Sequence, residues 1–264
     1  MSNHAATLSD RVLLSVSGPD KESFLDGLVS NSLTPLSTGK AVFTCLLTPQ
    51  GKVLHDFLIY PFEDDFLLDV AAADAPVLAK KLGFYKLRAD VEISTTDMTV
   101  SAVWGDVADL PSTPFMFRDP RLDALGLRVI GPLPEILTPR LVEADMYTHH
   151  RILNGVPQGP AEIDSSSAFP LEYRLDKLNG IDFHKGCFIG QEVTSRAYRK
   201  GSLRKALFVV AFDGAVAAGD PVLDGERTVG EVRAVSGTQG LALLRLDRLD
   251  AKLTTQQAEV TLKD

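Results

Sequence analysis

The chain has only two cysteines among its 264 residues, Cys45 and Cys187, and they lie far apart in the sequence. No disulfide framework is therefore implied, and the usage fits a reducing compartment. Two thiols are also too few for a permanently bound iron–sulfur cluster, which usually takes four cysteine ligands. His184 and Cys187 have the spacing of some zinc ligands, but no closed four-ligand pattern accompanies them. We expect no permanent metal site.

Long apolar runs and an excess of positive charge are also missing. No stretch approaches the length that crosses a bilayer, so we expect no membrane-spanning segment and no membrane among the partners. A net charge of −8 and a pI of about 5.2 argue against nonspecific nucleic-acid binding, which depends on neutralising many phosphates. The polar residues 1–10 have the layout of neither a secretory signal nor a transit peptide, and we expect a cytoplasmic location.

The composition is that of a folded protein with a substantial core, since 45% of the residues are hydrophobic and 23% are charged. In the first half, apolar patterning predicts a helix after Asp20, a second helix from Asp74 with Val77, Leu78, Leu82 and Tyr85 turned inward, and strands at residues 11–17, 41–47, 52–60, 66–70, 91–94 and 100–104. A type I turn at residues 48–51 joins two of these strands as a hairpin. This alternation indicates an α+β fold.

The second half begins with a surface connection at residues 106–120, a strand at 125–130 and a helix at 138–154. After residue 203 the pattern changes to short strands separated by glycine turns, which indicates a small β-barrel or sandwich. We therefore expect a first region at residues 1–202, built from two intertwined α+β subdomains, and a C-terminal barrel domain at 203–264. No heptad pattern or long apolar face suggests self-association, so we expect a monomer.

The strongest chemical signal is the octapeptide KGCFIGQE at residues 185–192, which places Cys187 between two glycines. Glycine permits backbone conformations and close approaches that other residues resist, so the loop can present the sulfur to a ligand. Lys185, His184, Arg196 and Arg199 favour the thiolate if they point at the sulfur. The alternatives are a buried inert thiol, a Cys187–His184 hydrolase dyad without a third orienting residue, and a merely solvated positive face.

Two further groups could bind a ligand. Asp56 lies inside an apolar strand, where an unpaired carboxylate is costly to bury, so it needs either a ligand or a structural hydrogen bond. Tyr85, Lys86 and Arg88 combine an aromatic face with cations that could stack on a ring and pair with carboxylates. The alternative for this second group is an amphipathic helix end. Trp104, the only tryptophan, is expected in the core.

Several motifs together resemble the folate-binding YgfZ family and its mitochondrial iron–sulfur assembly counterpart, which are related to the glycine-cleavage aminomethyltransferases. The resemblance covers most of the chain and rests on PLE at 170–172, NGIDFH at 179–184, the octapeptide, SRA at 195–197, GSLRK at 201–205, LTPQGKVL at 47–54 and YKLRADV at 85–91. It implies an aminomethyltransferase-like folate-binding region followed by the barrel, with tetrahydrofolate or a derivative as cofactor.

The residue chemistry and the resemblance together give the candidate site residues. Cys187, Lys185 and Asp56 are the candidate catalytic residues, and Asp56 stands at the position of the catalytic aspartate of the aminomethyltransferases. The candidate folate contacts are Asp56, Tyr85, Arg88, Gln191, Glu192 and Arg196. One departure is that Leu153 occupies the position of a folate-contacting glutamate, which argues against ordinary glycine-cleavage activity.

Three functional hypotheses follow. The leading one is a folate-binding accessory protein that assembles or repairs iron–sulfur clusters through Cys187, as a transient iron ligand or by attacking a damaged sulfur species. Its partners would be iron–sulfur assembly proteins or client enzymes. The second is a folate-dependent one-carbon transferase, and the third is a folate-sensing scaffold without catalysis. Whether the chain is an enzyme is left open by the sequence.

Overall fold

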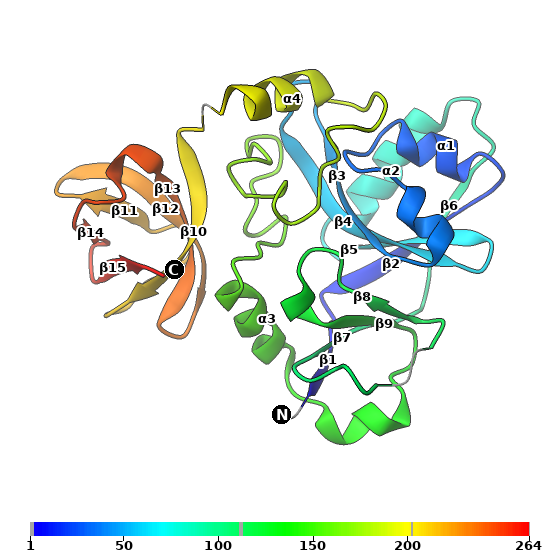
Figure 1. The fold of residues 1–264 in the computed structure, drawn as a ribbon, viewed down its shortest axis with the longest axis horizontal. Helices are drawn as coiled ribbons and strands as arrows, with labels where there is room; N and C mark the ends of the chain where they lie inside the picture. Colours follow the sequence, from blue (N-terminus) through cyan, green and yellow to red (C-terminus); the bar gives the residue numbers. More distant parts are fainter. Residues whose placement is uncertain (1–2, 111–112, 202, 264) are drawn as a thin grey trace.

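Two open β-sheets and a closed barrel make up the computed structural model of the chain, which describes residues 3–110, 113–201 and 203–263 (Figure 1). The barrel lies at one end of the molecule and the five-stranded sheet at the other (Figure 1). Helix α4 (Gln191–Lys200) leads from the cysteine loop toward the barrel.

The five-stranded sheet has the order β3-β4-β5-β2-β6, and all of its paired strands are antiparallel. Helix α1 (Lys21–Asp26) and helix α2 (Ala75–Lys86) bury Leu25, Leu78 and Leu82 in the core on one face of the sheet. The predicted hairpin turn is confirmed, since Gly51 N–H donates to the Thr48 carbonyl over 2.8 Å. The strands are β2 (Arg11–Ser17), β3 (Val42–Leu47), β4 (Val53–Phe62), β5 (Asp65–Ala71) and β6 (Glu92–Thr95).

The four-stranded sheet has the order β1-β7-β9-β8 and packs on the opposite face of the first sheet through the largest hydrophobic core. Trp104 belongs to this core and is 5% exposed, as expected. The sheet and its surroundings comprise β1 (His4–Thr7), β7 (Val100–Trp104), β8 (Met116–Arg118), β9 (Leu127–Ile130), the 3₁₀ segments η2 (Asp123–Leu125) and η3 (Glu135–Arg140), and helix α3 (Ala144–Leu153). The 3₁₀ segment η1 (Thr34–Thr38) lies beside β4 of the five-stranded sheet.

The C-terminal part is a closed barrel with the strand order β10-β13-β12-β11-β14-β15. Val210, Val232 and Leu244 lie in its hydrophobic core. Closure leaves no open sheet edge, and it decides between the barrel and the sandwich that the sequence allowed. The elements are β10 (Lys205–Phe212), β11 (Pro221–Asp224), β12 (Arg227–Ser236), β13 (Gln239–Arg245), η4 (Leu246–Arg248), β14 (Leu253–Thr254) and β15 (Glu259–Leu262).

The barrel is docked on the first region by apolar and polar contacts: Leu207, Ala234 and Leu241 join the large core, and polar contacts accompany them. Arg233 of β12 donates to the Glu162 carbonyl over 3.1 Å and pairs with the Asp164 carboxylate. Leu207 N–H donates to the Glu172 carbonyl over 2.8 Å. The proposed boundary between residues 202 and 203 stays a prediction, and Ser202 lies outside the described residues.

Some expected elements differ in the structure. The helix predicted at 138–154 is divided, because Leu141 and Val142 pair with strand β1: Val142 N–H donates to the Ala5 carbonyl over 2.8 Å. The connection at 106–120 contains β8, and α4 was not predicted. Val77 is 58% exposed and faces outward rather than inward.

Candidate functional site

Cys187 is exposed on the loop that precedes α4, and its neighbours on both sides are fixed in the protein. On one side the Lys185 side chain is 3% exposed, and on the other Phe188 is 7% exposed and belongs to the large core. The loop therefore holds the thiol outward between two buried anchors. This arrangement excludes the inert buried cysteine that the sequence left open.

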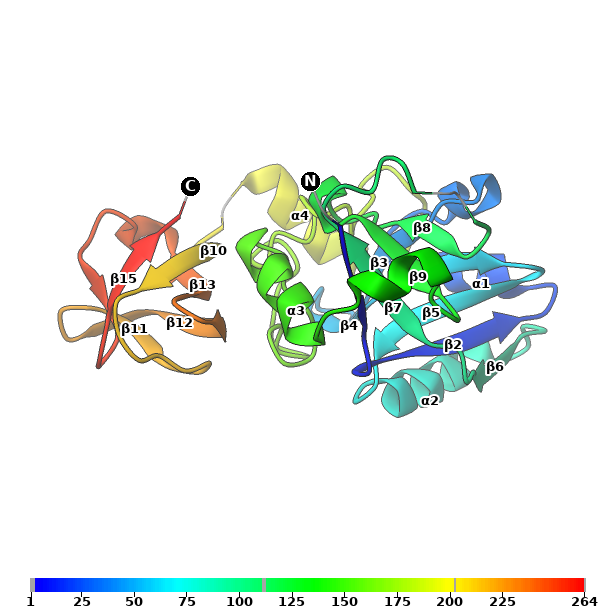
Figure 2. The same ribbon diagram turned by 90° about the horizontal axis from the view of Figure 1, so that it is seen from below.

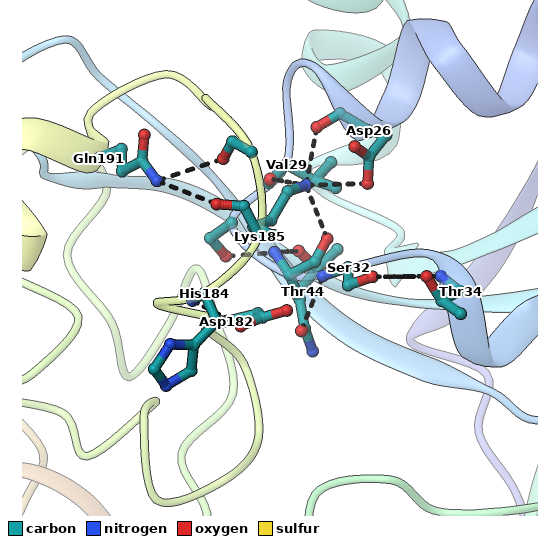
Figure 3. Close-up of polar contacts among 12 residues, drawn as sticks. Asp26, Val29, Ser32, Thr34, Thr44, Asp182, His184, Lys185 and Gln191 are labelled. Carbon is teal, nitrogen blue, oxygen red and sulfur yellow. Dashed lines mark hydrogen bonds and ion pairs between the residues drawn. The ribbon is translucent and has the colours of Figure 1, made fainter.

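The Lys185 ammonium is directed at the end of α1 and the segment that follows it (Figure 3). Its Nζ lies 2.7 Å from the Asp26 carbonyl, 3.0 Å from Asp26 Oδ1, and 3.0 Å from each of the Val29 and Asn31 carbonyls. An ammonium has three donors, so these four acceptors occupy it fully. The structure thus gives Lys185 an anchoring contact, and its predicted catalytic role stays a prediction.

The two glycines of the loop differ in their surroundings. Gly190 has φ = 82°, and a Cβ atom there would lie 2.5 Å from the Thr48 carbonyl oxygen of the hairpin turn. Only glycine permits both the left-handed backbone and this close approach. A Cβ atom at Gly186 would meet nothing within 4 Å. Glycine is therefore required at position 190 for the loop to pack on the hairpin, whereas the space around Gly186 would admit a side chain.

Helix α4 begins directly after the loop and positions the remaining residues of the octapeptide. The Gln191 side-chain amide donates back to the Gly186 carbonyl over 3.2 Å, so it closes the loop (Figure 3). Glu192 and Arg196 form an exposed i,i+4 pair with 3.7 Å between Oε1 and Nη2. Such a pair contributes little stability, so both side chains are available to a ligand or partner.

A cavity of about 450 Å³ adjoins the cysteine loop and α4. On one side of it the Phe183 ring stacks on the Tyr198 ring at a centroid distance of 3.9 Å. The sequence analysis missed this aromatic pair because α4 was not predicted, and only the helix brings Tyr198 to Phe183. The lining residues are Phe183, His184, Gln191, Glu192, Ser195, Tyr198 and Arg199.

Asp56 lies in β4, on the face that carries Leu58 and Tyr60 toward the core between the two sheets. Its side chain is buried, and its Oδ1 accepts the Gly159 N–H over 3.0 Å. Burial raises the pKa of the Asp56 carboxyl, while Arg11 and Arg121 oppose the rise. Of the two roles that the sequence allowed for Asp56, the structural hydrogen bond is thus present.

A network of buried charges lies on the same side of the sheet, and the sequence analysis missed it. Arg11 donates to Asp69 over 2.6 Å, and Arg121 donates to Asp119 over 2.7 Å. Burial alone would raise the pKa of Asp119, but Arg121 and Arg128 hold it well below its usual range. The sequence feature that could have predicted this network is a charged residue inside an apolar strand, such as Asp69 in β5 and Arg128 in β9.

Tyr85 and Arg88 lie at the C-terminal end of α2, on the other face of the sheet from Asp56. Tyr85 packs against the core beneath α1 and α2, and Arg88 is exposed. The predicted folate contacts are therefore distributed over three places: the core between the sheets, the end of α2, and α4. They do not form one binding chamber for a pterin and its glutamate tail.

Among the described residues, no group of three or more histidine, cysteine, aspartate or glutamate residues is placed to hold a metal ion. No described helix is both long and apolar enough to cross a membrane.

Comparison with known proteins gives the family. The GCVT N-terminal domain family matches residues 8–109, and the family described as CAF17, C-terminal beta-barrel domain matches residues 204–264. The iron–sulfur cluster assembly factor IBA57, mitochondrial, of Homo sapiens is 34% identical over 96% of this chain and 80% of its own length. The chain belongs to the IBA57 family. The Mus musculus IBA57 is 31% identical, with 97% of this chain and 81% of that protein covered.

Other IBA57 relatives are longer. The IBA57 homolog of Neurospora crassa is 35% identical over 79% of this chain, but only 54% of the relative is covered. The chain thus spans about half the length of that fungal relative. Among solved structures, glycine cleavage system aminomethyltransferase T from Bartonella henselae aligns with a TM-score of 0.82 over 99% of this chain and 85% of that one. At 16% identity this similarity concerns the fold alone, and it confirms the predicted α+β aminomethyltransferase-like fold.

The predicted cytoplasmic location is wrong. The IBA57 relatives from human, mouse and Neurospora crassa are all named as mitochondrial proteins. The prediction rested on composition and on the polar character of residues 1–10, and neither property of a folded chain specifies a compartment.

Proposed function

We propose that this chain is an accessory factor for the assembly or repair of iron–sulfur clusters and that it acts through Cys187. The names of the IBA57 relatives support a role in iron–sulfur cluster assembly, and one structural observation supports the involvement of Cys187. Cys187 is an exposed thiol held between the buried side chains of Lys185 and Phe188. A thiol fixed in this way keeps its position when a partner approaches, which is what a shared ligand needs.

The proposed chemistry is transient coordination of the iron of a cluster, which is the substrate. The Cys187 thiol releases its proton to solvent, and the resulting thiolate forms one sulfur–iron bond without any change of oxidation state. Among the described residues no side chain is hydrogen-bonded to the Cys187 sulfur, which suits a metal ligand better than a nucleophile activated by an adjacent base. One thiolate cannot hold a cluster alone, so the partner supplies the other ligands.

The partner would approach over α4. Glu192 and Arg196 are exposed there, and the cavity beside Phe183 and Tyr198 opens next to the cysteine loop. These features offer a partner both charged contacts and a recess for a side chain.

The test is complementation in cells that lack their own copy of the protein. We expect the intact chain to restore the activities of iron–sulfur enzymes and Cys187→Ala to fail, with both proteins present at equal level. Cys45→Ala, which removes the other thiol, is the matched control and should complement. Complementation by Cys187→Ala would contradict the proposed role of the thiol.

A tetrahydrofolate ligand is a second proposal, and only the aminomethyltransferase-like fold supports it. The predicted contacts do not fit a single chamber, so no chemical step is assigned to folate here, and a one-carbon transferase gains no support from the site. Equilibrium dialysis with tetrahydrofolate tests the proposal. Loss of binding in Asp56→Ala but not in Arg88→Ala would locate folate between the sheets, and the reverse would locate it at α2. Absence of binding to the intact chain would reject it.

A further inference from the structure

The outer face of α2 is unusual for a surface helix. Leu78 and Leu82 are buried against the sheet, as expected for the inner face. On the outer face, Val77 is 58% exposed and Phe84 is 68% exposed, and Leu87 directly after the helix is 88% exposed. The spacing i, i+7 places Val77 and Phe84 in one stripe on the helix, and Leu87 follows just past the helix end. Apolar groups normally occupy only the inner face of such a helix, so the stripe needs an explanation.

The same face carries only positive charge. Lys80 and Lys81 line a shallow hollow of about 330 Å³ together with Val77, Phe84 and Tyr85. Lys86 and Arg88 follow at the C-terminal end, and residues 75–88 contain no aspartate or glutamate. This concentration of cations stands out in a chain whose net charge is −8. Of the flanking acidic residues, Asp74 is paired with His55 over 3.0 Å, and Asp90 lies beyond the helix end.

Leu87 adds a strained backbone to this face. It has φ = 44° and ψ = −99°, a conformation that a bulky non-glycine residue rarely adopts. The residue is also almost fully exposed, so its side chain gains little from packing within the protein. A strained position whose side chain points into solvent is typical of a functional site.

We propose that the outer face of α2 is a peripheral binding surface for an anionic lipid bilayer. Phe84, Leu87 and Val77 enter the boundary of the acyl chains, while Lys80, Lys81 and Arg88 lie at the level of the lipid phosphates. Combining apolar insertion with attraction to anionic headgroups is how amphipathic helices bind membranes from one side.

The shape of the face favours a bilayer over a protein partner. A leucine that is 88% exposed would need a deep, matching pocket on a protein, whereas acyl chains accept an apolar side chain of any shape. Long cationic side chains beside it can extend to the phosphates while their methylene stems stay in the apolar layer. Helix α2 also forms the lower boundary of the molecule in Figure 2, so a flat surface can reach it.

The test is co-sedimentation of the full chain with vesicles of phosphatidylcholine alone or of equal parts phosphatidylcholine and phosphatidylglycerol. We expect binding to the anionic vesicles only, weakened by salt. Lys80→Gln should lower the partition coefficient roughly fivefold, as expected from about 1 kcal/mol per basic residue near an anionic surface. Arg227→Gln, which removes an exposed cation from β12 of the barrel, is the matched control and should bind like the intact chain.

Leu87→Asn separates membrane binding from folding. Asparagine adopts positive φ more readily than leucine, so the thermal midpoint should stay equal or rise. Loss of the inserted apolar side chain should nevertheless lower vesicle binding about tenfold. Equal binding by Leu87→Asn and the intact chain would overturn the insertion of this face. Absence of binding to anionic vesicles would overturn the whole proposal and favour an acidic, apolar protein segment as the occupant.

Discussion

At the scale of single residues, the two thiols have opposite environments. Burial raises the pKa of the Cys45 thiol well above its usual value, and Asp56 raises it further. Cys187 is exposed to solvent. Because the thiolate is the reactive form, accessibility and pKa together decide which cysteine is modified.

We therefore predict that iodoacetamide alkylates Cys187 in the native protein and leaves Cys45 unmodified until the chain unfolds. Peptide mass spectrometry at neutral pH, with and without denaturant, measures both positions. Cys187→Ala provides the control, since native labelling should then disappear. Rapid native labelling of Cys45 would show that the core around β3 opens more easily than the structure indicates.

Among the buried carboxyls, Asp56 and Asp119 should affect stability in opposite directions. Asp119 has a lowered pKa, so its ionised form stabilises the fold above the unfolded pKa of about 3.9, and this contribution is lost as the pH falls below that value. Asp56 has a raised pKa, so its ionisation costs stability at neutral pH, and the cost disappears as the pH falls through the raised pKa.

At pH 7 we thus expect Asp119→Asn to lower the free energy of unfolding by about 3 kcal/mol, because it leaves Arg121 and Arg128 without their buried partner. Asp56→Asn should raise the free energy of unfolding, since asparagine can still accept the Gly159 N–H. Urea denaturation from neutral to acidic pH measures both, and each difference should shrink as the pH falls. A destabilising Asp56→Asn would mean that the charge at this position has a structural partner.

At the scale of elements, the cysteine loop is defined by its contacts with its neighbours. Gly190 fits against the Thr48–Gly51 turn between β3 and β4, and Lys185 and Phe188 fix the stretch around the thiol. The loop and the hairpin are therefore one structural unit, although more than 130 residues of sequence separate Gly51 from Gly190.

We predict that Gly190→Ala displaces the loop, because its Cβ would overlap the Thr48 carbonyl and alanine resists φ = 82°. A loss of roughly 1–3 kcal/mol in the free energy of unfolding is expected from the strained backbone alone. Gly186→Ala is the matched control and should have little effect, since its Cβ would meet no atom within 4 Å. Calorimetry and the alkylation rate of Cys187 compare the two, and equal effects would contradict the assigned packing.

At the scale of the whole molecule, a buried arginine joins the barrel to the first region beside the shared apolar core. Arg233 is 8% exposed and bonds both the Glu162 carbonyl and the Asp164 carboxylate. We expect Arg233→Ala to lower the free energy of unfolding by about 2 kcal/mol, because it leaves the carbonyl of the buried residue Glu162 without its donor.

Loosening that junction should also split the unfolding transition, with the barrel and the first region melting separately. Differential scanning calorimetry shows whether one transition or two occur. Arg245→Ala, which removes a partly exposed arginine paired with Asp247, is the control and should retain the behaviour of the intact chain. A single unchanged transition in Arg233→Ala would show that apolar packing, including the contact of α3 with β12 and β13, unites the two parts.

Much of the fold could be predicted because patterns of neighbouring residues specify the individual strands and turns. Alternating apolar residues and the Thr48–Gly51 turn fixed the β3–β4 hairpin, and the short glycine-separated strands marked the barrel. The octapeptide identified the loop and its family, since its glycines and cysteine are adjacent in the sequence. Cys187 could be singled out for the same reason.

Long-range contacts decided the rest. Pairing of Leu141 and Val142 with β1 divided an apparently continuous helix, and the acceptors around Lys185 come from residues more than 150 positions away. Strand alternation and sheet packing put Asp56 and Tyr85 on opposite faces, although both had been assigned to one ligand. The sequence determined which chemical groups exist and which local elements form, whereas only the tertiary structure decided which groups meet, because that depends on the packing of distant segments.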